Sequence, residues 1–195
     1  MTEGLYVAAQ KTASSRARRT LLLIAAIGIA PVIASYAAYY FWPPQARDNY
    51  GELLSTRPAP LVEGVRSDGQ TFRLAELRGR WVLLMSSPAR CDAICERMLY
   101  ATRQARTIQG GDQDRVMRVW FVTGEGDASP ALLAQHPGLE VVRIDEAAQA
   151  NPATFDGRIY LIDPLGNWVL AWPADPDIKA LAKDLGRLLR ASQIG

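Results

Sequence analysis

Two cysteines, Cys91 and Cys95, are the residues of this 195-residue chain whose type and spacing favour chemistry most directly. They stand in the segment SSPARCDAICERM, after an apolar run of strand length and at the predicted start of a helix. A spacing of four residues would place both sulfur atoms on one helix face, with Cα atoms roughly 6 Å apart and within reach of a disulfide. Such a pair can cycle between dithiol and disulfide, or bind a soft metal ion such as Cu(I).

A position at a helix N-terminus would affect the reactivity of Cys91. Unpaired backbone N–H groups and the partial positive charge at that end stabilise a thiolate, and Arg90 would add to the effect. Asp92 would instead cap the helix and oppose the thiolate. The alternative is an inert disulfide or two small buried residues. A disulfide that closes so short a loop constrains the unfolded chain little, so the context favours a functional pair.

The segments around the cysteines predict an α/β domain over residues 61–195. Asp68-Gly69 lies between two strand-like runs and predicts a hairpin turn. Further strands are expected at 81–87, 116–123, 139–144, 158–162 and 168–172. Helices are expected after Pro88, at Ser129-Pro130 and at Asp175-Pro176. This order predicts a parallel βαβ half joined to a ββα half, giving a mixed sheet with helices on both faces.

An uncharged run of 23 residues, 20–42, lies ahead of that domain. It is long enough to cross a hydrocarbon core of ~30 Å as a helix, and we interpret it as one transmembrane helix in which Pro31 is tolerated. Residues 1–19 carry a net charge of +3, which predicts a cytoplasmic basic tail and an external C-terminal domain. In a bacterium this means a single-pass inner-membrane protein with a periplasmic domain. A cleaved signal peptide is the alternative, but the long apolar run and its bulky aromatic end favour an uncleaved anchor.

The remaining composition narrows the possible functions. Residues 43–60 hold four prolines and are expected to form a linker. Outside the basic tail the net charge is −1, so we expect no nucleic-acid partner. His136 is the only histidine, which argues against a serine protease or a zinc hydrolase; we expect it to be solvent-exposed near a helix end. Four tryptophans in predicted strands are expected to pack in the core: Trp81, Trp120, Trp168 and Trp172.

The run from Asp68-Gly69 into WVLLMSSPARCDAIC resembles the Sco/SenC family, as does the later segment 159–166, IYLIDPLG. These are membrane-anchored proteins of thioredoxin fold that help load copper into cytochrome c oxidase. The resemblance covers roughly residues 61–190. It implies a thioredoxin-like fold, Cys91 and Cys95 as redox-active and copper-binding thiols, Cu(I) as the ion, and the copper-site subunit of cytochrome c oxidase as partner.

Two positions depart from the pattern of that family. Asp92 stands where the family usually has proline, and Phe155 or Asp156 stands where it has a third copper ligand, a histidine. Two thiolates suit Cu(I) better than Cu(II), which favours nitrogen ligands. The chain therefore resembles a divergent member that lacks the usual ligand histidine.

Three functions remain open at this point. The first is assistance in cytochrome c oxidase assembly by thiol–disulfide exchange, Cu(I) transfer or both, with Cys91 as the attacking thiol and Cys95 as the resolving one. The second is a general periplasmic thiol–disulfide reductant that acts on other periplasmic thiol proteins. The third is a non-catalytic assembly scaffold with a static disulfide. If the protein is an enzyme, it is a thiol–disulfide oxidoreductase.

Overall fold

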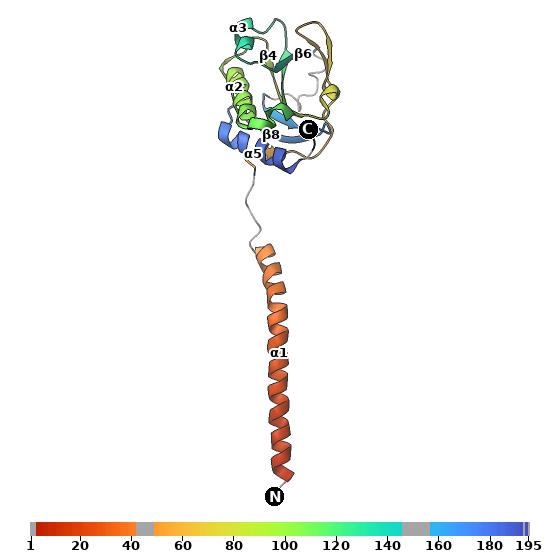
Figure 1. Cartoon of the computed structure of the whole chain (residues 1–195), viewed down its shortest axis with the longest axis vertical. Coiled ribbons are helices and arrows are strands. Elements are labelled where there is room, and N and C mark those ends of the chain that lie inside the picture. The colour runs from red at the N-terminus through yellow and green to blue at the C-terminus, as the bar shows by residue number, and fades with distance from the viewer. Residues whose placement is uncertain (1–2, 42–48, 146–156, 193, 195) are drawn as a thin grey trace. The chain divides into compact units, whose positions relative to one another are not determined.

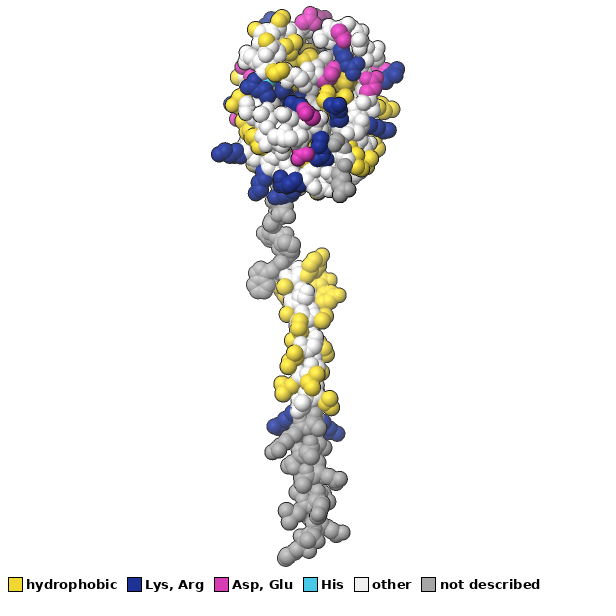
Figure 2. Space-filling model, in the orientation of Figure 1, with side chains coloured by type: hydrophobic (Ala, Val, Ile, Leu, Met, Phe, Trp, Pro, Cys, Tyr) yellow, Lys and Arg dark blue, Asp and Glu magenta, His cyan; other side chains and the backbone are white. Residues whose placement is uncertain are grey.

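The computed structural model describes residues 3–41, 49–145, 157–192 and 194, and the chain divides into two compact units, residues 1–47 and 48–195. The described part of the first unit is the helix α1 (Glu3–Phe41), which contains Pro31. Its segment Arg18–Phe41 is long and apolar enough to cross a membrane. Apolar side chains cover the described surface of this segment, and basic side chains mark its start (Figure 2). The helix begins at Glu3, so most of the predicted basic tail is itself helical.

The described residues of the second unit form a mixed sheet of eight strands in the order β1-β8-β7-β4-β5-β6-β2-β3. Figure 1 labels β4, β6 and β8 of this sheet. The strands are β1 (Glu52–Leu53), β2 (Glu63–Arg66), β3 (Thr71–Arg73), β4 (Trp81–Pro88), β5 (Val116–Thr123), β6 (Leu139–Arg143), β7 (Ile159–Ile162) and β8 (Trp168–Trp172). The helices are α2 (Ala93–Ile108), α3 (Pro130–Ala134) and α5 (Ile178–Ala191), and two 3₁₀ turns span Leu74–Leu77 and Gly110–Arg115. β4, β5 and β6 run parallel, and the other pairings are antiparallel. The predicted mixed α/β sheet is confirmed.

β4 and β5 form the middle of the sheet, paired over their whole length from Trp81↔Val116 to Pro88↔Thr123. Their side chains alternate between two buried clusters, which explains why both strands read as continuous apolar runs. One cluster contains Leu83, Met85 and Trp120 and is covered by α2 and α5. The buried leucines of α5, among them Leu181 and Leu185, lie in this cluster, so α2 and α5 pack on the same face.

The other face of the sheet has a different cover among the described residues. Its cluster is closed by side chains of the β2–β3 hairpin, the 3₁₀ turn that follows it and the segment before β2, namely Phe72, Leu74, Leu77, Val62 and Ala59. The sequence predicted helices on both faces; the described helices α2 and α5 occupy one. Phe72 and Phe121 meet edge to face with centroids 5.9 Å apart, which anchors the hairpin on the sheet.

Local turn chemistry explains most element boundaries. The Asp68-Gly69 hairpin is confirmed, with Gly69 at φ +83°, a backbone conformation that glycine adopts without strain. α5 begins two residues later than predicted: Asp177, and not Asp175, is the cap, and its carboxylate accepts a hydrogen bond from the amide of Ala180 at 2.9 Å. Both aspartates precede an apolar residue, but the amide of Asp177 also donates a hydrogen bond to the Tyr50 hydroxyl at 3.1 Å, a tertiary contact that favours this cap site.

The predicted linker 43–60 requires a correction. Glu52–Leu53 pairs with β8 as an edge strand, and Pro58 forms a bridge to Asn167, so this segment belongs to the folded unit. A strand of two residues between prolines has no periodic pattern, and therefore it cannot be predicted from hydrophobic periodicity. Residues 42–48 lie outside the described residues.

Asp184 of α5 ties this N-terminal segment to the core. Its side chain is 2% exposed, and Oδ2 accepts hydrogen bonds from the Gly51 amide at 2.8 Å and from Trp172 Nε1 at 3.2 Å. Gly51 is required here because a Cβ would lie 2.5 Å from the Trp172 indole nitrogen. One buried acceptor thus fixes the start of the folded unit, β8 and α5 together.

Replacement of Asp184 should destabilise the folded unit strongly. In Asp184→Ala, two buried donors lose their acceptor, so we expect a loss of about 2–3 kcal/mol in the free energy of unfolding. Urea unfolding followed by tryptophan fluorescence measures it. The matched control is Asp175→Ala, which removes one exposed ion pair with Arg97 and should cost about 0.5 kcal/mol or less. Equal losses in the free energy of unfolding in the two variants would contradict this role of the buried Asp184 hydrogen bonds.

Candidate redox site

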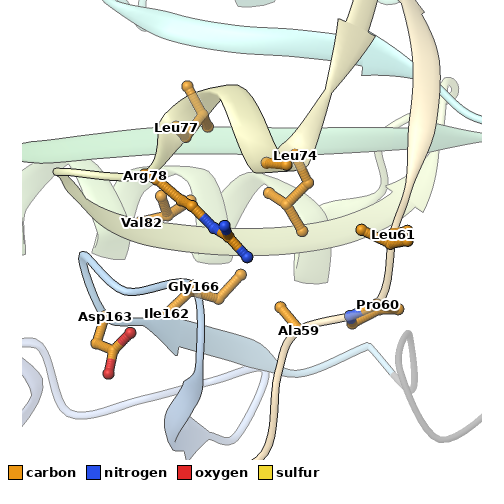
Figure 3. A pocket seen from close by; sticks show the side chains of 11 residues that line it. Ala59, Pro60, Leu61, Leu74, Leu77, Arg78, Val82, Ile162, Asp163 and Gly166 are labelled. Carbon is orange, nitrogen blue, oxygen red and sulfur yellow. The ribbon is translucent and has the colours of Figure 1, made fainter.

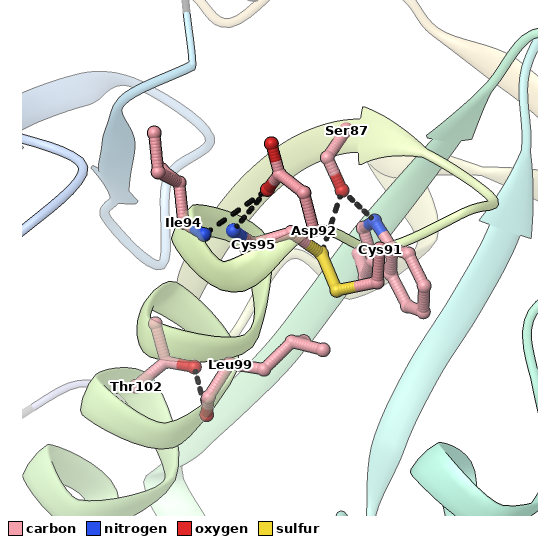
Figure 4. Close-up of a disulfide and its surroundings, with 8 residues drawn as sticks. Ser87, Cys91, Asp92, Ile94, Cys95, Leu99 and Thr102 are labelled. Atoms are coloured by element: carbon pink, nitrogen blue, oxygen red, sulfur yellow. Dashed lines mark hydrogen bonds between the residues drawn. A yellow bond between two sulfur atoms is a disulfide. The ribbon is translucent and has the colours of Figure 1, made fainter.

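Cys91 and Cys95 are joined by a disulfide at the junction of β4 and α2, with Cα atoms 5.3 Å apart (Figure 4). Cys91 lies in the loop after β4, and Cys95 lies in the first turn of α2. The prediction that both cysteines are helical is wrong for Cys91. Because Asp92 caps the helix and α2 begins at Ala93, Cys91 stays outside it.

Asp92 uses its carboxylate to close the helix N-terminus. Oδ1 accepts hydrogen bonds from the amides of Ile94 at 3.1 Å and Cys95 at 2.9 Å. These amides belong to the donors that the sequence predicted would stabilise a Cys91 thiolate. The structure corrects that expectation, since a carboxylate already accepts both bonds, and it confirms the alternative that Asp92 acts as the cap. The cap also holds the backbone of Cys95 in a fixed position.

The two sulfur-bearing residues differ in their access to solvent. Cys95 is 1% exposed and belongs to the core cluster under α2, whereas Cys91 is partly exposed. Cys91 also lines a groove of about 530 Å³. Further lining residues come from the loop after β4, the start of α2, the loop before α3 and α3 itself, including Arg90, Glu96, Glu125, Asp127 and Gln135. An incoming thiol or disulfide can therefore reach Cys91, while Cys95 is shielded.

Behind Cys95 lie two residues that the sequence analysis did not assign to the site. The Ser87 hydroxyl donates a hydrogen bond to Cys95 Sγ at 3.0 Å, and Trp120 Nε1 donates to Ser87 Oγ at 2.8 Å (Figure 4). Ser87 pairs with Val122 across β4 and β5, and Trp120 is two residues earlier on the same face. The sequence could have indicated this contact, because side chains alternate between the two faces of each strand and Ser87 and Trp120 fall on the same face of neighbouring strands. The predicted core position of Trp120 is confirmed, as it is for Trp81, Trp168 and Trp172.

His136 is buried, contrary to the expectation of a solvent-exposed residue. It is 6% exposed, and its Nδ1 lies 3.4 Å from Nη2 of Arg118, a guanidinium that is 2% exposed. Burial, together with the cations Arg118 and Arg103, lowers the pKa of His136 to about 4. Burial and the nearby Arg106 and Arg103 lower the pKa of Arg118 to about 10.

No metal-binding cluster of three His, Cys, Asp or Glu side chains occurs among the described residues. His136 lies against Arg118 and is not part of any such cluster with the cysteines. Phe155 and Asp156, one of which the resemblance places where the family has its histidine, lie outside the described residues. Within the part of the chain that the structure describes, the cysteine pair offers two sulfur ligands.

A second hollow lies between the 3₁₀ turn after β3 and the turn after β7 (Figure 3). It is lined mainly by aliphatic side chains, with Arg78 and Asp163 at its edge. Its volume is about 30 Å³, enough for about one water molecule. Asp163 Oδ1 accepts hydrogen bonds from the amides of Leu165 and Asn167, so it stabilises its own turn. This hollow is too small for a substrate.

The buried histidine should make stability depend on pH. The folded state keeps His136 neutral down to about pH 4, whereas the unfolded chain protonates it near pH 6.5. Stability is therefore lost as the pH falls from about 6.5 to 4, by about 3 kcal/mol or less. In His136→Gln this part of the pH dependence should disappear. The urea concentration at the unfolding midpoint, measured at pH 7, 5.5 and 4.5 for both proteins, tests this. An identical change of the midpoint with pH in the two proteins would refute it.

Comparison with known proteins agrees with this geometry. Residues 81–192 match the protein family described as "transmembrane-like, thioredoxin-like, C-terminal domain". No curated protein sequence matches the chain.

Solved structures share the fold at low sequence identity. Copper-bound ScoI of Arabidopsis thaliana superposes with a TM-score of 0.59 at 16% identity, covering 70% of this chain and 100% of its own. Apo Sco1 of Thermus thermophilus gives 0.57 at 20% identity, covering 73% and 96%. The thioredoxin domain of a Bacteroides vulgatus thiol–disulfide oxidoreductase gives 0.55 at 15% identity, covering 70% and 99%. The expected thioredoxin-like fold, similar to that of Sco/SenC proteins, is confirmed, and the chain belongs to the family of transmembrane-like, thioredoxin-like C-terminal domains.

Proposed function

We propose that this protein is a membrane-anchored thiol–disulfide exchange protein whose reactive pair is Cys91 and Cys95. The observation that carries the proposal is the asymmetric disulfide: Cys91 lines an open groove, and Cys95 is buried behind it. Exchange requires one sulfur that a partner can reach and a second sulfur that closes the ring. The shared fold with a thiol–disulfide oxidoreductase supports the same chemistry.

The exchange proceeds in two displacements. In the reduced protein, the Cys91 thiolate attacks one sulfur of a target disulfide, and the other target sulfur leaves with the electron pair as a thiolate. The Cys95 thiolate then attacks Cys91 Sγ, which closes the Cys91–Cys95 disulfide and releases the second target thiolate. Two electrons pass to the target, and its thiolates take up the two protons that the cysteines lost. A dithiol reductant in the same compartment returns the protein to its reduced state.

The apolar helix α1 and the charge pattern support a location for this reaction. The segment Arg18–Phe41 can cross a membrane, and the basic residues precede it. We place the basic tail in the cytoplasm, the helix in the bacterial inner membrane and the thioredoxin-like domain in the periplasm. There the copper-site subunit of cytochrome c oxidase, which presents cysteines, is the proposed target; another periplasmic thiol protein is the alternative. The Sco-like fold favours the oxidase subunit.

A trapping experiment tests the assignment of the two thiols. In Cys95→Ser the mixed disulfide cannot resolve, so full-length protein in membranes should accumulate as a covalent adduct through Cys91. Non-reducing electrophoresis and mass spectrometry of the adduct identify the target. The matched control Cys91→Ser should form little adduct because Cys95 is 1% exposed.

The outcomes separate exchange from the scaffold alternative. A pair that stays fully oxidised in membranes by thiol trapping, with no adduct in Cys95→Ser, would overturn the exchange function. Oxidase assembly at wild-type level in the double variant Cys91→Ser/Cys95→Ser would favour a scaffold with a static disulfide.

Cu(I) delivery is the second candidate function, favoured by the copper-bound structures that share this fold. Two thiolates released on reduction suit Cu(I), a soft ion that tolerates low coordination. Copper would be the cargo here, passed on to the target's own ligands. Among the described residues, no His, Asp or Glu completes a cluster of three with the cysteines, so the reduced pair fits Cu(I) better than Cu(II).

Metal titration of the reduced protein tests this candidate. We expect one Cu(I) per chain in competition with a chromophoric Cu(I) chelator, and no binding in Cys91→Ser/Cys95→Ser. Cu(II) should bind at least about tenfold more weakly, because the site lacks the nitrogen ligands that Cu(II) favours. Unchanged Cu(I) binding in the double variant would exclude the cysteine pair as the copper site.

A further inference from the structure

We propose that Ser87 and Trp120 are positioning residues that hold Cys95 as the leaving sulfur and set the redox equilibrium of the pair. This inference rests on the proposed exchange function and deepens it. It starts from one continuous chain of hydrogen bonds, from Trp120 Nε1 to Ser87 Oγ at 2.8 Å and from Ser87 Oγ to Cys95 Sγ at 3.0 Å. Figure 4 shows the dashed bond from the Ser87 hydroxyl to Cys95.

Trp120 determines where the serine proton points. An indole N–H can only donate, so it occupies an acceptor position on Ser87 Oγ. The single hydroxyl proton then remains for Cys95 Sγ. The Trp120 side chain is fully buried, and β4 and β5 are paired on both sides of this point, so the indole cannot turn away. The sheet thereby fixes the direction of the bond to Cys95.

The bond to Cys95 strengthens when the disulfide opens. A disulfide sulfur is a weak acceptor, whereas a thiolate accepts a charge-assisted hydrogen bond of about twice the strength. When a reductant thiolate attacks Cys91 Sγ, the Cys91–Cys95 bond breaks and its electron pair goes to Cys95 Sγ. Cys95 is 1% exposed, so water cannot solvate this charge well, and the Ser87 hydroxyl takes over that task. Ser87 therefore favours the reduced pair and the transition state that leads to it.

A purely structural role for Ser87 makes a different prediction. The hydroxyl also accepts the Trp120 N–H, so its loss leaves a buried donor unpaired and lowers stability. Such a loss changes the unfolding of both redox states alike and leaves the equilibrium between them unchanged. The reduction potential therefore separates the two roles.

The test uses the full-length protein in detergent micelles, equilibrated with dithiothreitol redox buffers and sampled by thiol alkylation. In Ser87→Ala we expect the equilibrium constant for reduction to fall about fivefold, which is a potential lower by roughly 20 mV at about 30 mV per tenfold. The rate of disulfide opening by dithiothreitol should fall by a similar factor. Ser87→Thr keeps the hydroxyl and should retain wild-type values, and Trp120→Phe should shift the potential in the same direction as Ser87→Ala.

Ser86→Ala is the matched control, because the strand alternation directs this buried neighbour to the opposite face of the sheet. It should leave the potential unchanged. A wild-type potential and opening rate in Ser87→Ala would overturn the inference, even if the Cys95→Ser trap captures a target. A pair that stays fully oxidised in membranes, with no trapped target but a shifted potential in Ser87→Ala, would instead overturn the exchange function; Ser87 would then set the redox equilibrium of a pair that exchanges with no target.

Discussion

The parallel pairing of β4 with β5 is the constraint on which the candidate site depends. It aligns eight residue pairs, buries both strands on two faces and places Ser87 beside Trp120 at the end of the sheet. The chain leaves β4 at Pro88 and reaches Cys91 before Asp92 turns it into α2. A shift of one residue in this register would direct Ser87 to the opposite face and break its contacts with Trp120 and Cys95. The site is thus an outcome of sheet packing.

Packing also creates the difference between the two sulfurs. α2 lies on the sheet through Cys95, Met98 and Leu99, so the first turn that carries Cys95 is drawn into the core. Cys91 precedes the cap and stays at the rim of the groove. The helix cap at Asp92 is the boundary between these two environments, because its carboxylate fixes the backbone at Cys95 and leaves Cys91 outside the helix. A disulfide that joins a shielded and an accessible sulfur follows from this local arrangement.

The sequence was sufficient for features that depend on local pattern. The continuous apolar strands β4 and β5 and the Asp68-Gly69 turn have strong short-range signals, and the structure confirms them. Features that depend on tertiary contacts were missed: β1, the choice of Asp177 as cap and the burial of His136 beside Arg118. The cysteine spacing identified the pair, but the Ser87 contact arises between strands and a helix, and sequence spacing alone does not show it. The Asp92 cap was foreseen as an alternative because aspartate prefers that position.

The two departures from the Sco/SenC pattern both leave the buried sulfur of the site unchanged. Asp92 in place of proline puts a carboxylate next to Cys91 and uses two helix amides, which weakens the support for a thiolate at the accessible sulfur. At the second departure, His136 does not replace the family's histidine: it is buried beside Arg118, and no cluster of three His, Cys, Asp or Glu side chains occurs among the described residues. Neither change affects the buried sulfur, whose partners are a hydroxyl and an indole fixed by the sheet. The chemistry that survives both changes is the one that needs a well-held leaving sulfur, and this favours disulfide exchange over a three-ligand copper centre.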